Sequence, residues 1–258
     1  MGERSEYVPG TFCWTDLTTT DQDAAKAFYS ALFGWSAEDI PVEDGVIYSM
    51  MSIDGHNVAA ISPQPKQQRD VGVPPLWNSY VSVGSADAIV ERAKELGGVA
   101  HAPAFDVMEA GRMAVLQDPQ GAYFLAWEPR MNPGAELVNA PGALVWNELQ
   151  SPDLDGSASF YSQLFGWDVA QFEGMPERYL SIKNAGANNG GIRELTPGQP
   201  PNWLVYFGID DLDAGLAKVE ELGGAKLMGP IDIQIAKLAV VQDQQGAVFA
   251  LYAGQLEP

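Results

Sequence analysis

The stretch GTFCWTDLTTTDQDAAKAFYSALFGW at residues 10–35 decides the fold, because a close copy, GALVWNELQSPDLDGSASFYSQLFGW, occupies residues 142–167. Aligned without a gap, the two stretches agree at 12 of 26 positions. The agreement includes a Phe-Tyr pair and the ending Leu-Phe-Gly-Trp. Repetition at such a distance along the chain indicates two copies of one folding unit.

Each stretch combines a strand with a helix. Phe12–Leu17 alternates in polarity and contains aromatic residues, which is typical of a strand. Asp21 is placed to cap a helix with apolar residues at helical spacing, and Gly34 is placed to end it. Short strands are predicted next, at Val46–Ile53 and Asn57–Ile61.

The later part of each copy repeats as well. PPLWNSYVSVGSADAIVERAKELGG at 74–98 parallels PPNWLVYFGIDDLDAGLAKVEELGG at 200–224, and residues 111–127 parallel residues 236–252. In the first copy this part predicts a strand, a helix and two strands joined by a hairpin, at 77–83, 87–96, 112–116 and 122–127. Each copy therefore contains the order strand–helix–strands twice.

These patterns predict an α+β chain of two domains. We place the first domain at residues 1–130 and the second at residues 142–258. The linker between them, residues 131–141, contains proline, glycine and asparagine, as is typical of a domain boundary. Because a tandem duplication can replace a homodimer, we expect a monomer.

Composition restricts the partners and the location. The net charge of −20 disfavours nucleic acid and anionic membranes, because like charges repel. The sequence has no apolar run of about 18 residues that would span a membrane. Its polar start predicts a cytoplasmic protein. Cys13 is the only cysteine, so an intrachain disulfide is impossible, and we expect it to be buried in a strand.

Together, the strand–Asp–helix block and the hairpin Asp118–Gly121 resemble the vicinal-oxygen-chelate superfamily, which includes glyoxalase I, bleomycin-resistance proteins and extradiol dioxygenases. The resemblance covers about residues 10–128 and 141–253. It is strongest to tandem two-domain actinobacterial members, a group that includes a mycobacterial culture-filtrate antigen and proteins labelled hydroxylase or glyoxalase. It implies that each domain pairs two βαβββ modules into a cupped mixed sheet with helices outside.

Metal enzymes of this superfamily hold a divalent ion with His or Glu on the first strand of each module and Glu on the last strand of the domain. Counting from the Phe-Tyr pairs, the later helices and the hairpins gives the equivalent residues here as Trp14, Asn78, Leu125, Trp146, Leu204 and Ala250. Since none of the six is His, Asp or Glu, we expect no metal and no other cofactor. A shift of two residues would bring Asp16 and Glu148 to the first-strand position, with no further ligand beside them.

Strand alternation predicts which side chains line the two cups. For the first cup they are Phe12, Trp14, Asp16, Tyr48, Met50, Asn78, Tyr80, Leu125 and Trp127. For the second cup they are Leu144, Trp146, Glu148, Tyr179, Ser181, Leu204, Tyr206, Ala250 and Tyr252. Arg112 and Lys237, at equivalent positions in the two copies, are candidates to pair with Asp16 and Glu148 or with a ligand.

Aromatic cups with one carboxylate each favour the binding of a small aromatic or polycyclic molecule, which stacks on the rings. Asp16 and Glu148 could hold a ligand amine or hydroxyl, or act as a general acid or base in a metal-free enzyme. A glyoxalase-type lyase or a dioxygenase- or hydroxylase-like enzyme with a divalent metal is the second interpretation. A structural or interaction protein with filled cups is the third.

Overall fold

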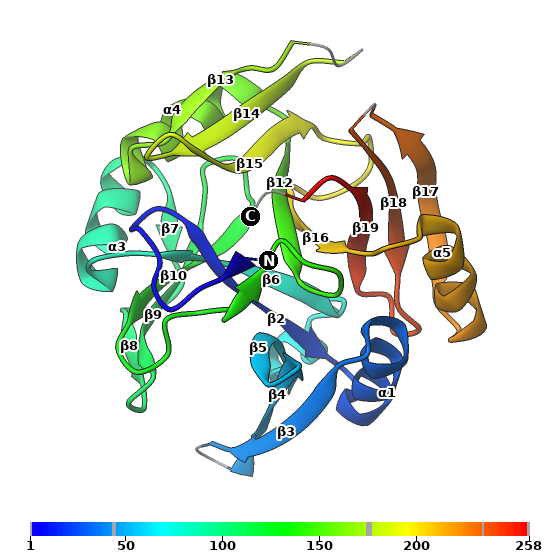
Figure 1. Ribbon diagram of the computed structural model, residues 1–258. Helices are drawn as coiled ribbons and strands as arrows, with labels where there is room; N and C mark the ends of the chain where they lie inside the picture. Colours follow the sequence, from blue (N-terminus) through cyan, green and yellow to red (C-terminus); the bar gives the residue numbers. More distant parts are fainter. Residues whose placement is uncertain (1, 43–44, 174–176, 234, 257–258) are drawn as a thin grey trace.

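The computed structural model describes residues 2–42, 45–173, 177–233 and 235–256 (Figure 1). Its elements up to the linker are β1 (Gly2–Glu3), β2 (Phe12–Thr19), α1 (Gln22–Phe33), β3 (Ser36–Pro41), β4 (Ile47–Ile53), β5 (His56–Pro63), α2 (Lys66–Asp70), β6 (Leu76–Ser82), α3 (Ala86–Glu95), β7 (Val99–Ala100), β8 (Phe105–Val107), β9 (Gly111–Gln117) and β10 (Tyr123–Pro129). The later elements are β11 (Leu137–Val138), β12 (Leu144–Ser151), α4 (Leu154–Phe165), β13 (Asp168–Gln171), β14 (Tyr179–Asn184), β15 (Ala187–Glu194), β16 (Asn202–Gly208), α5 (Leu212–Glu221), β17 (Ala225–Asp232), β18 (Ala236–Gln242) and β19 (Val248–Gly254).

Each copy of the repeat forms its own mixed sheet. The strand order is β3-β4-β5-β2-β6-β10-β9-β7 in the first sheet and β13-β14-β15-β12-β16-β19-β18-β17 in the second. The first strands of paired modules meet antiparallel, β2 with β6 and β12 with β16. The last strand of each module lies parallel to its first strand, as β5 does beside β2. The predicted α+β fold of paired modules is confirmed, while the domain limits stay a prediction.

The helix that follows each first strand is capped as predicted. The Asp21 side chain accepts a hydrogen bond from the backbone N–H of Ala24 at 3.0 Å, which satisfies one of the free donors at the start of α1. Gly34 ends the helix at φ 74°, in the left-handed region. Asp153 and Gly166 repeat both features at the ends of α4.

Strand β3, which directly follows α1, was missing from the prediction. Its residues are polar and mostly exposed, and it pairs with β4 at the edge of the first sheet. A strand that buries neither face carries no hydrophobic alternation, so pattern reading cannot find it. The elements α2, β7 and β8 were missed because they span only 5, 2 and 3 residues, too few to show a period.

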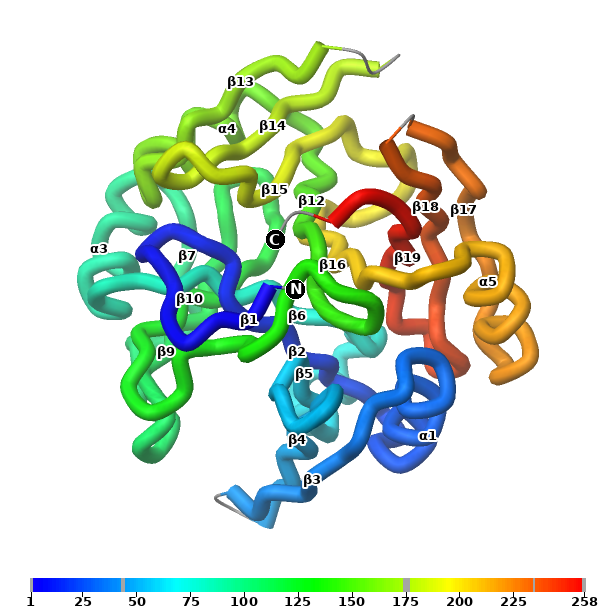
Figure 2. The backbone as a smooth tube through the Cα atoms, viewed as in Figure 1, coloured from blue at the N-terminus to red at the C-terminus, as the bar shows by residue number. Residues whose placement is uncertain are grey.

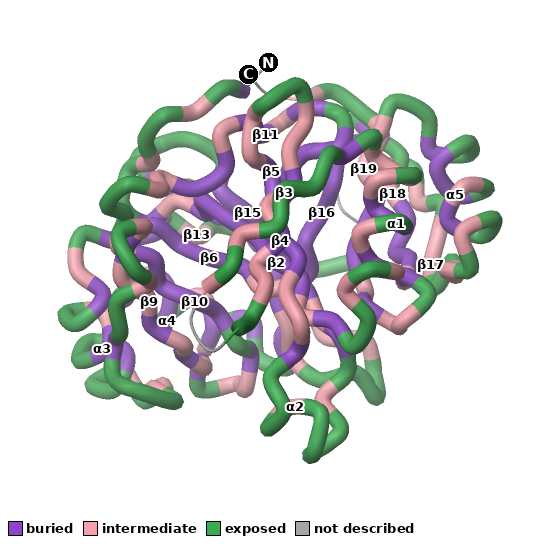
Figure 3. The backbone as a smooth tube through the Cα atoms, turned by 90° about the horizontal axis from the view of Figure 1, so that it is seen from below, coloured by how far each residue is buried: buried purple, intermediate pink, exposed green. Residues whose placement is uncertain are grey.

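The two sheets pack together through the faces opposite their cups. Figures 1 and 2 show β2 and β6 beside β12 and β16 at the centre, with α1 next to α5 on one side and α3 next to α4 on the other. Phe33 of α1 contacts Phe207 of β16, with ring centroids 5.2 Å apart. Burial is concentrated in these central strands, and many outer loops are exposed (Figure 3). Among the described residues, no helix is long and apolar enough to cross a membrane.

A reciprocal hydrogen-bond network joins the two halves. The hydroxyl of Tyr29 donates to Asp243 Oδ2 in the opposite half at 3.1 Å, and it accepts a hydrogen bond from Trp77 Nε1 at 3.0 Å. The same network recurs with the halves exchanged. There Tyr161 donates to Asp118 Oδ2 at 3.0 Å and accepts from Trp203 Nε1 at 2.9 Å. Both tyrosines are fully buried, so each half completes the core of the other.

Candidate functional site

The first cup is organised around the carboxylate of Asp16. Strand pairing sets Asp16 opposite Asn78 and Trp14 opposite Tyr80, so all four side chains share one face. Asp16 Oδ1 accepts a hydrogen bond from Asn78 Nδ2 at 2.8 Å. Asp16 Oδ2 accepts hydrogen bonds from the hydroxyls of Tyr80 at 2.7 Å and Tyr48 at 3.1 Å. Both oxygens of this buried carboxylate therefore have partners.

The rest of the first cup closes over this cluster. Trp14 Nε1 donates to the Tyr48 hydroxyl at 3.0 Å, and Trp14 is only 5% exposed. Leu125 and Trp127, on β10, are 5% and 7% exposed. Trp127 Nε1 donates to the carbonyl of Asn132 at 2.9 Å, which holds the indole against the start of the linker. The first cup is thus largely filled by its own side chains.

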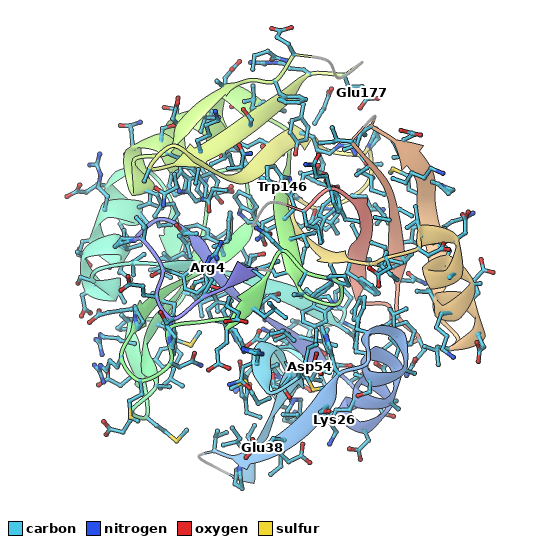
Figure 4. The ribbon with its side chains drawn as sticks, viewed as in Figure 1. Arg4, Lys26, Glu38, Asp54, Trp146 and Glu177 are labelled. Atoms are coloured by element: carbon cyan, nitrogen blue, oxygen red, sulfur yellow. The ribbon has the colours of Figure 1, made fainter. Side chains whose placement is uncertain are left out.

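The second cup repeats this geometry with a glutamate. Glu148 lies opposite Leu204, and Trp146 lies opposite Tyr206. Trp146 Nε1 donates to the Tyr179 hydroxyl at 3.0 Å, as Trp14 does to Tyr48. Figure 4 shows Trp146 between the β13–β15 and β17–β19 parts of the second sheet. Trp146 is half-buried, in contrast to Trp14.

Burial has the largest influence on the pKa of both carboxyl groups. Desolvation raises the pKa of Asp16 above its ordinary value, and hydrogen bonds from Asn78, Tyr80 and Tyr48 oppose that rise. Desolvation also raises the pKa of Glu148. There the positive charge of Arg193 opposes the rise, together with hydrogen bonding by Tyr206 and Tyr179. Sequence reasoning missed Arg193, which lies on β15 at the position of Ser62 in the first copy.

Arg112 does not pair with Asp16, contrary to the prediction. Its guanidinium forms ion pairs with Asp87 and Asp106, both at 3.0 Å, on the helix side of the first sheet. Arg112 lies opposite Glu128 on β10, one residue away from the cup-facing Trp127. Because neighbouring residues of a strand face opposite sides of the sheet, Arg112 faces away from the cup. Lys237 is exposed on β18 and lies opposite Ala253.

Phe12 and Leu144 also lie outside the cups. A β-bulge separates Phe12 from Trp14, and the equivalent irregularity separates Leu144 from Trp146. The Phe12 ring instead contacts Trp203 of the other half at a centroid distance of 4.8 Å. The extra residue of each bulge turns the start of the strand away from the cup. The other predicted cup residues keep the sheet positions that alternation assigned, and their role in binding stays a prediction.

A surface hollow of about 640 Å³ borders the first cup. Tyr48, the hydroxyl donor to Asp16, forms part of its wall, together with Thr18 and Gln22. Lys66 and Arg69 also line it. Tyr48 therefore separates the hollow from the buried carboxylate.

Comparison of the sequence with known proteins identifies the family. The model of the Glyoxalase/Bleomycin resistance protein/Dioxygenase superfamily matches residues 11–125. The protein CFP32 of Mycobacterium bovis, which is named as a proposed glyoxylase, is 43% identical over 97% of both chains. The chain belongs to this superfamily. The anthracycline biosynthesis protein DauV of a Streptomyces species is 32% identical over 96% of this chain and 94% of its own length.

Solved structures of the superfamily share the fold. The Mn(II)-bound glyoxalase of Novosphingobium aromaticivorans superposes with a TM-score of 0.67 at 15% identity, over 96% of this chain and 83% of that one. A trihydroxybiphenyl dioxygenase of Sphingomonas wittichii superposes with a TM-score of 0.66 at 14% identity, over 97% and 92%. At such identities the likeness establishes the fold alone.

The residues at the inherited metal position do not fit a divalent cation. Trp14 and Trp146 stand where the superfamily's first-strand ligands are expected, and neither indole offers a lone pair for a metal. Both oxygens of Asp16 are already hydrogen-bonded. Across the described residues, no three His, Cys, Asp or Glu side chains come together as ligands. The inherited metal position therefore offers no set of side chains that would hold a divalent ion.

The raised carboxyl pKa values predict a pH-dependent stability. A carboxyl whose pKa is raised by folding stabilises the fold when protonated, fully below its unfolded value, and loses that contribution as pH rises through the folded value. The ordinary values are 3.8 for Asp16 and 4.5 for Glu148. The double variant Asp16→Asn/Glu148→Gln should therefore gain stability relative to wild type as pH rises from about 4 to neutral, by about 1.4 kcal/mol for each unit of raised pKa.

Urea unfolding at a series of pH values, followed by tryptophan fluorescence, measures this difference. The variants keep the size of each side chain and an acceptor oxygen, so the trend with pH reports the lost titration. A difference in unfolding free energy that stays constant over the series would contradict the raised pKa values.

Proposed function

We propose that this chain binds a flat aromatic or polycyclic small molecule in an aromatic cup, without a metal ion. The observation that carries the proposal is the buried carboxylate of Asp16 beside the Trp14 indole and the hydroxyls of two tyrosines, Tyr80 and Tyr48. Such a cup offers ring faces for stacking and a polar group to orient the ligand. Glu148 in the second cup and Asp16 in the first are the candidate orienting groups.

The names of the relatives support a fused-ring ligand. Two Streptomyces relatives, 32% and 31% identical to this chain, are named for anthracycline biosynthesis. Anthracyclines are flat polycyclic molecules that carry hydroxyl groups, which suits a ring stacked on tryptophan with a hydroxyl near a carboxylate. The ligand of this chain need only share that chemistry.

Naphthol and quinizarin are suitable probes, because both are flat, fused-ring molecules with a hydroxyl group. We expect either probe to quench tryptophan fluorescence and to raise the melting temperature, with a binding stoichiometry measurable by calorimetry. Trp146→Ala or Trp14→Ala should weaken binding about tenfold or more, according to which cup is used. Tyr123→Ala, a loss of an aromatic ring that is 49% exposed, is the control.

Failure of every planar probe to bind, with Trp14→Ala and Trp146→Ala merely destabilising the chain, would contradict the proposal. That result would favour the interpretation in which both cups are filled cores.

A glyoxalase-type lyase is the second candidate, and the name of CFP32 favours it. Elemental analysis of the purified chain and turnover of the methylglyoxal–glutathione adduct test it directly. A stoichiometric divalent metal together with turnover would replace our proposal.

We further propose that the chain acts as a monomer in the cytoplasm. The aromatic faces of the two halves already cover each other, as Tyr29 and Tyr161 illustrate, so a second chain is not needed to bury them. The mass of the protein in solution, measured by light scattering, tests the oligomeric state.

A further inference from the structure

The two cups differ at one hydrogen-bonding position. In the first cup, Asn78 donates its amide N–H to Asp16 Oδ1 at 2.8 Å. Leu204 occupies the equivalent position opposite Glu148, and a leucine has no donor to offer. Among the described residues, none donates a hydrogen bond to Glu148 Oε1, although this oxygen is buried and the residue is only 5% exposed.

A buried acceptor without a partner is costly. Leaving one unsatisfied destabilises the fold, and the loss is greater for a charged group. The remaining interactions of Glu148 come from Arg193 and from the hydroxyls of Tyr206 and Tyr179. Oε1 is therefore a buried acceptor that a ligand donor can complete.

The second cup has smaller side chains at four of its wall positions. Four equivalent pairs show the trend, each with the larger residue in the first copy: Met50 and Ser181, Ala60 and Gly191, Leu125 and Ala250, Trp127 and Tyr252. Trp146 and Tyr252 are half-buried, whereas Trp14 and Trp127 are buried. The second cup is thus more accessible than the first at Trp146 and Tyr252.

Charged residues border the second cup. Arg193 lies opposite Tyr179 in the sheet, and its guanidinium contacts the Glu177 carboxylate at 3.3 Å. Figure 4 places Glu177 at the outer margin of the second sheet, away from Trp146. The lining of the second cup thus grades from aromatic and apolar at Trp146 and Leu204 to charged at its edge.

We infer that the second cup alone is the ligand site, and that it selects planar aromatic molecules carrying a hydroxyl or amine that donates a hydrogen bond to Glu148 Oε1. This inference rests on the proposed function, which concerns either cup. The ring stacks against Trp146, and the donor completes the position that Asn78 occupies in the first cup. The first cup is closed because its own amide has taken that role.

A substitution that supplies the missing donor tests the inference. Leu204→Asn introduces the amide that Asn78 provides in the first cup, so it should satisfy Oε1 internally and weaken naphthol binding about tenfold or more. Leu227→Asn, the same chemical change at a residue that is 51% exposed on β17, is the matched control. Calorimetry should give one naphthol per chain for wild type and for Leu227→Asn.

A second measurement does not depend on the folding of a variant. Methoxynaphthalene has the same ring system as naphthol but lacks the O–H donor. Wild type should bind it about tenfold or more weakly than naphthol, because Oε1 then stays unsatisfied. Equal affinity for the two molecules would overturn the assigned hydrogen bond.

The outcomes separate this inference from the proposed function. If Asp16→Asn abolishes naphthol binding while Leu204→Asn leaves it intact, the site is the first cup. The inference then fails and the proposed function stands. If two naphthols bind per chain with similar affinity, both cups bind ligand and the inference also fails. If no planar probe binds wild type, the proposed function itself fails.

Discussion

Replacing Tyr29 with alanine is expected to lower the free energy of unfolding by about 4 kcal/mol. The ring is fully buried, stacks on Trp35 at a centroid distance of 5.7 Å and meets Trp77 edge-on at 5.1 Å. Its removal leaves a cavity at the junction of the two halves and deprives Asp243 of a hydrogen-bond donor. Urea denaturation with fluorescence and circular dichroism measures the loss.

Tyr123→Ala is the matched control, because the same atoms are removed from a residue that is 49% exposed. It should cost less than about 1 kcal/mol, since surface substitutions are usually mild. A loss below about 2 kcal/mol for Tyr29→Ala would mean that the junction relaxes around the missing ring and contributes little to stability.

Asp118→Ala should have the second largest effect, a loss of about 3 kcal/mol. The carboxylate is 3% exposed and accepts hydrogen bonds from the backbone N–H groups of Gln120 at 3.0 Å and Ala122 at 2.8 Å. It also accepts the hydroxyl of Tyr161 at 3.0 Å. Alanine would remove the acceptor of three donors, the two N–H groups of the hairpin and the buried hydroxyl of Tyr161 in the opposite half.

A double-mutant cycle isolates the part of this loss that crosses between the halves. Tyr161→Phe removes the hydroxyl alone, and its effect should be much smaller in the Asp118→Ala background than in wild type. The expected coupling is about 1 kcal/mol or more, measured by urea unfolding of the four proteins. Strictly additive effects would show that the 3.0 Å contact carries no energy of its own.

Most of the fold could be predicted, because its determinants are local and repeated. The caps Asp21 and Gly34 act on their own helix, and strand alternation placed Trp14, Asp16 and Tyr80 on one face. Strand β3 could not be found, since an exposed edge strand has no apolar periodicity. A segment can thus be predicted when one of its faces is buried and apolar, and is missed when both faces are exposed.

The candidate site was predictable in position but not in its contacts. Phe12 was misplaced because a bulge is a property of the pairing between strands rather than of one strand. Arg112 was named because it is equivalent to Lys237, and only the strand pairing shows that it lies on the opposite face from Trp127. The unpartnered oxygen of Glu148 depends on Leu204 in a distant strand, so only the folded arrangement reveals it.

The tyrosine network that crosses between the halves has an evolutionary consequence. Each half depends on a hairpin aspartate of the other half, so substitutions at this interface in one copy must be matched in the other. The interface residues are the same in both copies: Phe28 and Phe160, Tyr29 and Tyr161, Trp77 and Trp203, Asp118 and Asp243. The two cups face away from that interface, so their residues are free to diverge in sequence. In a duplicated protein of this design, one domain can lose its binding function and serve only for stability, while the other evolves specificity for a new ligand.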